Sequence, residues 1–112
     1  MISFKLIEDG VFASFEEGEI TAKAFFKIEG LFCEVYKVDF PSDKLYLFHG
    51  LIRSIFNYAT DFNAYIGKLT DESCFDIAGT MNFIFDGKCW SNDIPTLLMG
   101  TCGSCGDFSP EI

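Results

Sequence analysis

Gly18 to Gly30 read GEITAKAFFKIEG, the clearest alternating pattern in the chain. Apolar side chains occupy every second position between the two glycines, and polar or charged side chains fill most of the positions between them. A period of two places successive side chains on opposite faces, which is typical of a β-strand with one buried face. The apolar set expected to share that face is Ile20, Ala22, Ala24, Phe26 and Ile28.

The segments on either side of this strand continue the same pattern. Alternation over residues 2–6 and 11–15, and again over residues 31–40, predicts three further strands separated by turn residues. Short turns favour antiparallel neighbours, so residues 2–40 are expected to form a four-stranded meander.

The period changes after Pro41. Ser42 is a suitable helix N-cap, and Asp43 places an acidic group in the first turn. Apolar residues then recur at helical spacing, which predicts a helix over residues 43–59. Its polar stripe consists of Tyr46, His49, Arg53 and Asn57.

Beyond the helix the sequence returns to strand patterns. Residues 62–69 and 75–85 predict two strands, and Asp86-Gly87 predicts a hairpin turn into residues 88–90. The expected fold class is therefore α+β, a mainly antiparallel sheet (meander or half-barrel) of about six to seven strands packed on one central helix. Residues 1–112 form one domain, with residues 101–112 expected to be a loop or tail.

Charge narrows the class of partner. The 112 residues carry 8 Lys and Arg against 17 Asp and Glu, a formal net charge of -9. This balance argues against nucleic acid or an anionic membrane as a direct partner, and it favours a basic protein.

The compartment is expected to be the cytoplasm. The N-terminus lacks the apolar run of a secretory signal, and the longest uncharged stretch, residues 94–106, is interrupted by proline and glycine. Five cysteines, an odd number, fit reduced thiols better than a disulfide framework. We expect a soluble protein that is a monomer when free.

No motif in the chain indicates a catalysed reaction. The one histidine, His49, has no positioned catalytic partner in the sequence, and no phosphate loop, dinucleotide fingerprint, nucleophile elbow or zinc-protease motif occurs. The chain is therefore expected not to be an enzyme and to need no cofactor or metal.

An alternative function rests on Cys102-Gly103-Ser104-Cys105. Two thiolates at this spacing can share zinc or form a redox pair, and Cys74 and Cys89 could complete a zinc site. A third possibility is a half-barrel lined by the 14 phenylalanines around an apolar ligand pocket.

Acidic residues gather where the meander turns. Because turns alternate between the two ends of a meander, five carboxylates are expected at one end; we call them the acidic rim: Glu16, Glu17, Glu19, Asp39 and Asp43. One interpretation is that they are solvated turn residues that keep the domain soluble. The other is a docking face for a basic protein, with Tyr46 as an exposed aromatic anchor.

The chain resembles the small acidic immunity proteins of bacterial toxin–immunity systems, including contact-dependent growth inhibition. The resemblance lies in size, charge, the missing catalytic motif and acidic stretches such as Glu16-Glu17-Gly18-Glu19 beside Asp39-Phe40-Pro41-Ser42-Asp43. It implies a cytoplasmic protein that binds one cognate toxin domain, often a nuclease, and blocks its active site.

Overall fold

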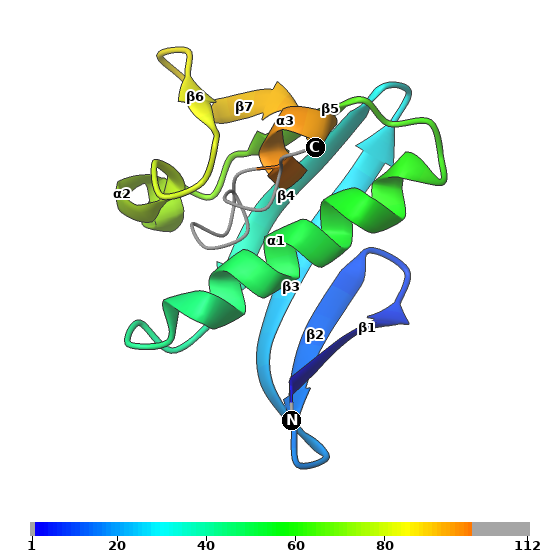
Figure 1. The fold of residues 1–112 in the computed structure, drawn as a ribbon, viewed down its shortest axis with the longest axis vertical. Helices are drawn as coiled ribbons and strands as arrows, with labels where there is room; N and C mark the ends of the chain where they lie inside the picture. The colour runs from blue at the N-terminus through cyan, green and yellow to red at the C-terminus, as the bar shows by residue number, and fades with distance from the viewer. Residues whose placement is uncertain (1, 100–112) are drawn as a thin grey trace, which may run out of the picture.

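The computed structural model describes residues 2–99 and has the α+β fold expected from the sequence (Figure 1). Seven strands form one sheet, and one long helix lies across it. The strands are β1 (Ile2–Glu8), β2 (Val11–Glu16), β3 (Glu19–Glu29), β4 (Phe32–Asp39), β5 (Ile66–Leu69), β6 (Ile84–Phe85) and β7 (Trp90–Asp93). The helices are α1 (Leu45–Thr60), a 3-10 turn η1 (Glu72–Cys74), α2 (Phe75–Ala78) and α3 (Ile94–Met99).

The sheet begins as the predicted meander. Its strand order is β1-β2-β3-β4-β5-β7-β6, and every neighbouring pair is antiparallel except β4 and β5. The first hairpin turns at Gly10, whose φ is +82°. A Cβ there would lie 2.9 Å from the Phe26 carbonyl oxygen, so glycine is required for both conformation and space.

Helix α1 covers one face of the sheet and supplies much of the core. Its fully buried side chains are Leu47, Phe48, Leu51, Ile52, Ile55, Phe56 and Ala59. They pack against the inward side chains of the sheet, including Ala22, Ala24, Phe26 and Val35.

The sequence prediction is wrong at the start of α1 and at the start of β3. The helix begins at Leu45, after a turn in which the Lys44 amide donates to the Pro41 carbonyl, so Ser42 does not act as its N-cap. Ile20 does not share the buried face of β3, because the β2–β3 register shifts between Ser14 and Phe15. That bulge turns Ile20 outward, where 47% of it is exposed.

The predicted strand over residues 75–85 is also wrong. This segment forms α2, which directly follows η1, and a turn, and only Ile84 and Phe85 pair in the sheet. Its buried residues are Ala78, Met81 and Phe83; the first two are three positions apart, which suits a helical turn, and Phe75, Ile77 and Phe85 of the expected face are not buried. The alternating apolar residues of this segment therefore do not share one face, as a strand would require.

The end of the described chain is a short hairpin followed by α3. The predicted turn at Asp86-Gly87 is confirmed: the Asp86 carboxylate accepts the amides of Lys88 and Cys89, and β6 pairs antiparallel with β7. The stretch predicted as a loop or tail, residues 101–112, lies outside the described residues.

Gly67 is a point of close packing between the sheet and the helices. It is buried in β5, and a Cβ there would lie 2.6 Å from the Phe56 ring and 2.8 Å from a methyl group of Leu97. We expect Gly67→Ala to lower the free energy of unfolding by about 1–3 kcal/mol, because the core would be overpacked. Urea unfolding checks this against Gly79→Ala, an exposed glycine with φ of -68° whose added Cβ would meet only the Trp90 ring, at an ordinary contact distance of 3.8 Å.

Asp71 ties the segment after β5 to β4. Its carboxylate accepts the Val38 amide at 2.8 Å and the amide and hydroxyl of Ser73. Desolvation alone would raise the pKa of Asp71, but the hydrogen bonds from Ser73 and Val38 outweigh it and hold the pKa below 3.8.

Replacing Asp71 by alanine is expected to cost about 1–3 kcal/mol at neutral pH, because the Val38 amide loses its partner. Folding lowers the Asp71 pKa, so its stabilisation is complete above pH 3.8 and is lost as the pH falls through the folded value. Unfolding midpoints of wild type and variant should therefore converge in acid. A difference between the two midpoints that stays constant with pH would contradict a role for the charge of the Asp71 carboxylate. Asp76→Ala, which removes an exposed carboxylate, is the control.

Candidate functional site

The acidic rim begins at the β2–β3 hairpin. Glu17 and Gly18 both have positive φ, 54° and 84°, which folds the turn tightly and leaves Glu17 and Glu19 exposed. Glu16 is half-buried, and the Tyr46 hydroxyl of α1 donates to its Oε2 at 3.4 Å. The structure thus brings the hairpin carboxylates next to the first turn of α1.

The other two rim carboxylates lie on the connection from β4 to α1. Asp39 ends β4 directly opposite Lys23 of β3, and Asp43 is exposed in the loop that follows. An open groove of about 410 Å³ runs between the two segments, lined by Ile20, Thr21, Ala22, Lys23, Asp39, Phe40 and Pro41. Four residues of β3, roughly 13 Å of strand, separate Asp39 from the hairpin tip.

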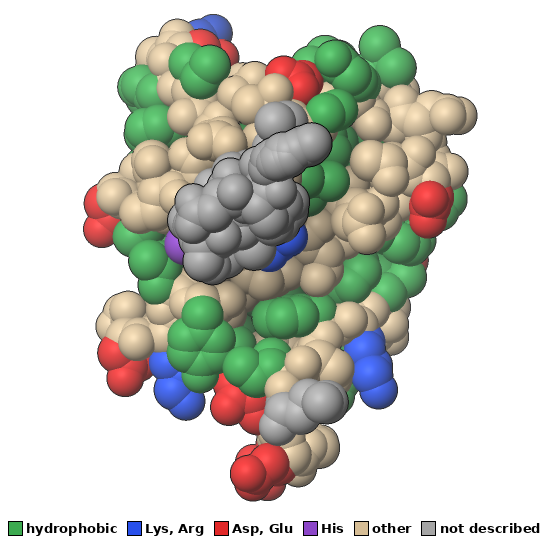
Figure 2. Space-filling view, viewed as in Figure 1, with side chains coloured by type: hydrophobic (Ala, Val, Ile, Leu, Met, Phe, Trp, Pro, Cys, Tyr) green, Lys and Arg blue, Asp and Glu red, His purple; other side chains and the backbone are tan. Residues whose placement is uncertain are grey.

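The acidic rim is therefore one end of the molecule with two acidic parts. Figure 2 shows acidic side chains along the lower end of the view, where the hairpin and the β4–α1 loop lie in Figure 1. Lys23 and Lys44 lie on the elements between the parts and reduce their charge. Two exposed apolar side chains flank the hairpin, Ile20 at 47% and Tyr46 at 48% exposure.

Most basic side chains lie on the sheet face that α1 does not cover. Strand alternation and register place five of the eight there: Lys5, Lys23, Lys27, Lys37 and Lys68. Three of them lie over phenylalanine rings of the same face, at 5.7, 5.7 and 4.3 Å from the ring centres. Lys27 pairs with Glu34 at 3.9 Å. The open sheet face thus holds most of the lysines, together with the carboxylates of Glu34 and Asp39, which lie opposite Lys27 and Lys23.

His49 has a structural partner. Its Nε2 lies 2.8 Å from the Thr80 hydroxyl oxygen, and that hydroxyl donates in turn to the Ile77 carbonyl. Nε2 must therefore carry a proton and act as the donor. Desolvation and the nearby Arg53 lower the pKa of His49 below 6.5, so the ring is neutral at pH 7. It links α1 to the turn after α2.

The described thiols are poorly suited to chemistry. Burial raises the pKa of Cys33 to about 12 and, with help from Asp71, that of Cys74 to about 11, so both stay protonated at neutral pH. Within residues 2–99, no three His, Cys, Asp or Glu side chains are grouped so that they could hold a metal. Cys102 and Cys105, on which the thiol or zinc alternative rests, lie outside the described residues.

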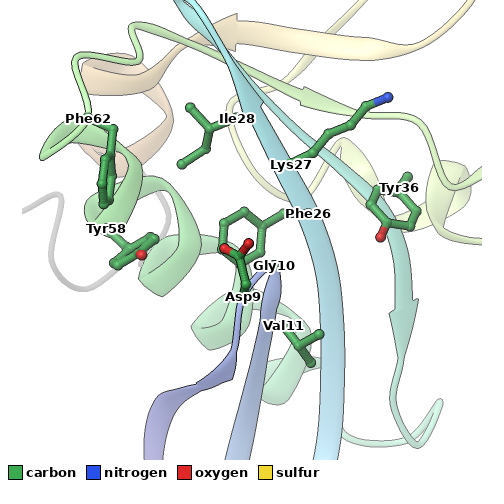
Figure 3. Close-up of a pocket in the computed structure, with 9 residues that line it drawn as sticks. All are labelled: Asp9, Gly10, Val11, Phe26, Lys27, Ile28, Tyr36, Tyr58 and Phe62. Atoms are coloured by element: carbon green, nitrogen blue, oxygen red, sulfur yellow. The ribbon is translucent and has the colours of Figure 1, made fainter.

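The sequence did not reveal an open cleft at the end of the sheet opposite the acidic rim (Figure 3). Strand β3 has 11 residues and β2 only 6, so β3 runs on past the β1–β2 turn. The resulting space has a volume of about 440 Å³. Its lining residues are Asp9, Gly10, Val11, Phe26, Lys27, Ile28, Tyr36, Tyr58 and Phe62.

Aromatic rings from the end of α1 form one wall of this cleft. The Tyr58 ring lies 5.9 Å from Phe26 in an edge arrangement and 5.0 Å from Phe62, which is 51% exposed. Asp9, at the turn, is exposed. Asp9 and Gly10 predicted a turn in the sequence. No local sequence pattern indicated that this turn would lie close to Tyr58 and Phe62, almost fifty positions later.

Comparisons with known proteins add no family. No protein-family model matches the chain, and no curated protein matches its sequence. Among residues 2–99, no helix is long and apolar enough to cross a membrane.

Proposed function

We propose that this protein is a non-enzymatic, cytoplasmic immunity protein that binds a cognate basic toxin domain and neutralises it. The observation that carries the proposal is the acidic rim, where Glu16, Glu17 and Glu19 lie beside the exposed side chains of Ile20 and Tyr46. Carboxylates around exposed apolar groups are a suitable surface for a basic protein, because the charges steer association and the apolar groups are buried on contact.

The class of toxin follows from charge. A nuclease active site must hold phosphates, so it is positive, and a rim of carboxylates can occupy the same site. The net charge of -9 favours the encounter over long range, although salt screens it beyond about 8–10 Å. We therefore propose a nuclease domain as the target and occlusion of its active site as the mechanism.

The placement of the lysines supports the orientation of the complex. The open sheet face carries five lysines against three carboxylates, Glu29, Glu34 and Asp39, so it is less attractive to a basic partner than the carboxylate-rich hairpin end. A basic domain is therefore expected to approach along the strands, at the hairpin end, and not onto the open face.

The direct test is capture of a partner by the tagged full chain. The probe is the protein encoded by the adjacent gene, offered at a series of salt concentrations. We expect capture of a protein with a basic domain, and weaker capture as salt rises. Capture that does not change with salt, or no capture of any basic protein, would contradict the proposal.

A further inference from the structure

The cleft beside the β1–β2 turn leaves main-chain groups of β3 without a neighbouring strand. The β2–β3 register ends with Val11 opposite Phe25, and the Phe26 amide donates to the Gly10 carbonyl at 2.9 Å. Backbone groups of residues two apart point to the same side of a strand. The amide and carbonyl of Ile28 therefore point into the space beyond Gly10, where no strand of residues 2–99 pairs with them.

These unpaired groups indicate the kind of occupant. An amide and a carbonyl on one residue of a strand match the carbonyl and amide of another extended chain, which can add to the sheet in line with β2. The residue of that chain directly opposite Ile28 would point its side chain toward the same face as Ile28. That face is the one covered by α1, where Tyr58 and Phe62 lie.

The surroundings of that side chain favour a positive charge. The faces of the Tyr58 and Phe62 rings attract cations, and the Asp9 carboxylate stands on the opposite wall (Figure 3). Glu8 and Glu29 belong to the same end of the sheet. The lining cation, Lys27, extends away from the rings in Figure 3 and pairs with Glu34.

We propose that this cleft binds an extended basic segment of a partner protein, with an arginine placed between the rings and Asp9 and its main chain paired with Ile28. A guanidinium suits both walls, because it stacks on aromatic faces and bonds to carboxylates. The cleft lies at the end of β2 opposite the acidic rim, so this inference goes beyond the proposed toxin contact and does not depend on it.

The test uses the full chain, labelled with ¹⁵N, and a synthetic peptide of sequence acetyl-Val-Thr-Arg-Thr-Val-amide. We expect its addition to shift the amide signals of Gly10, Ile28 and Phe62. Replacing arginine by neutral citrulline should weaken binding at least about threefold, because the cation–π contact and the attraction of the guanidinium to the Asp9 carboxylate are lost. No shift at these three amides, or equal affinity for citrulline, would overturn the proposal.

Two further comparisons separate the side-chain and main-chain contacts. Methylating the backbone amide nitrogen of the peptide's arginine removes the main-chain donor that would pair with Ile28, and it should abolish most of the shift of the Ile28 amide signal. Unchanged binding of the methylated peptide would overturn strand pairing. Asp9→Asn should weaken the arginine peptide about as much as citrulline does, whereas Asp76→Asn, on α2, should not. Equal effects of the two variants would overturn the assignment of Asp9.

Discussion

Replacing Phe56 by alanine is expected to lower the free energy of unfolding by about 3–5 kcal/mol. Phe56 is fully buried on α1, and its ring lies 6.0 Å from that of Phe83 in an edge arrangement. The ring also packs on the bare backbone of Gly67 in β5. The substitution would leave a cavity where helix, sheet and the segment before β6 meet.

Urea denaturation measures this loss. Asn57→Ala changes the next, exposed position of the same helix and should alter stability by no more than about 0.5 kcal/mol. Because a small domain has only about 5–15 kcal/mol of stability, Phe56→Leu provides a smaller change that keeps the protein folded. A loss for Phe56→Ala no larger than that of the control would contradict the description of the core.

Reversing the charge of the hairpin is expected to slow association with the basic partner about tenfold or more at low salt. The variant is Glu17→Lys with Glu19→Lys, two exposed residues of the acidic rim. The difference from wild type should shrink as salt is added, because screening removes the steering force. Stopped-flow or surface-based kinetics measure the association rate directly.

The matched control is Glu29→Lys with Asp61→Lys. Both residues are exposed, and the pair changes the net charge by the same amount at the far ends of β3 and α1, away from the acidic rim. If the two double variants slow association equally, net charge and not the rim is responsible, and the rim loses its place as the interface.

Strong local periodicity is what made the fold predictable. The two-residue alternation over β1–β4 extends far enough to exclude helices there. The helical spacing over α1 likewise extends far enough to exclude a strand. Residues 75–85 failed because their apolar side chains fit both periods over a short length. Asp71 caps η1 through the Ser73 amide, and this local hydrogen bond favours the helical turn.

The candidate sites were predictable only in part. Turn alternation in the meander sufficed to anticipate carboxylates at one end, and Tyr46 is exposed beside Glu16, as its place on the polar stripe of the helix predicted; its role as an anchor stays a prediction. The cleft depends on the unequal lengths of β2 and β3 and on the end of α1 returning to the β1–β2 turn. Neither relation is contained in a local pattern, because both arise from tertiary packing.

We propose that this protein neutralises a basic nuclease domain by occupying its active site. The most direct measurement is the nuclease activity of the captured domain, titrated with increasing amounts of the purified full chain. We expect the nuclease activity to fall to background as the two proteins become equimolar. At moderate salt, more of the Glu17→Lys/Glu19→Lys variant should be needed for the same inhibition. A domain that is saturated with this protein and still cleaves nucleic acid at its full rate would contradict the claim.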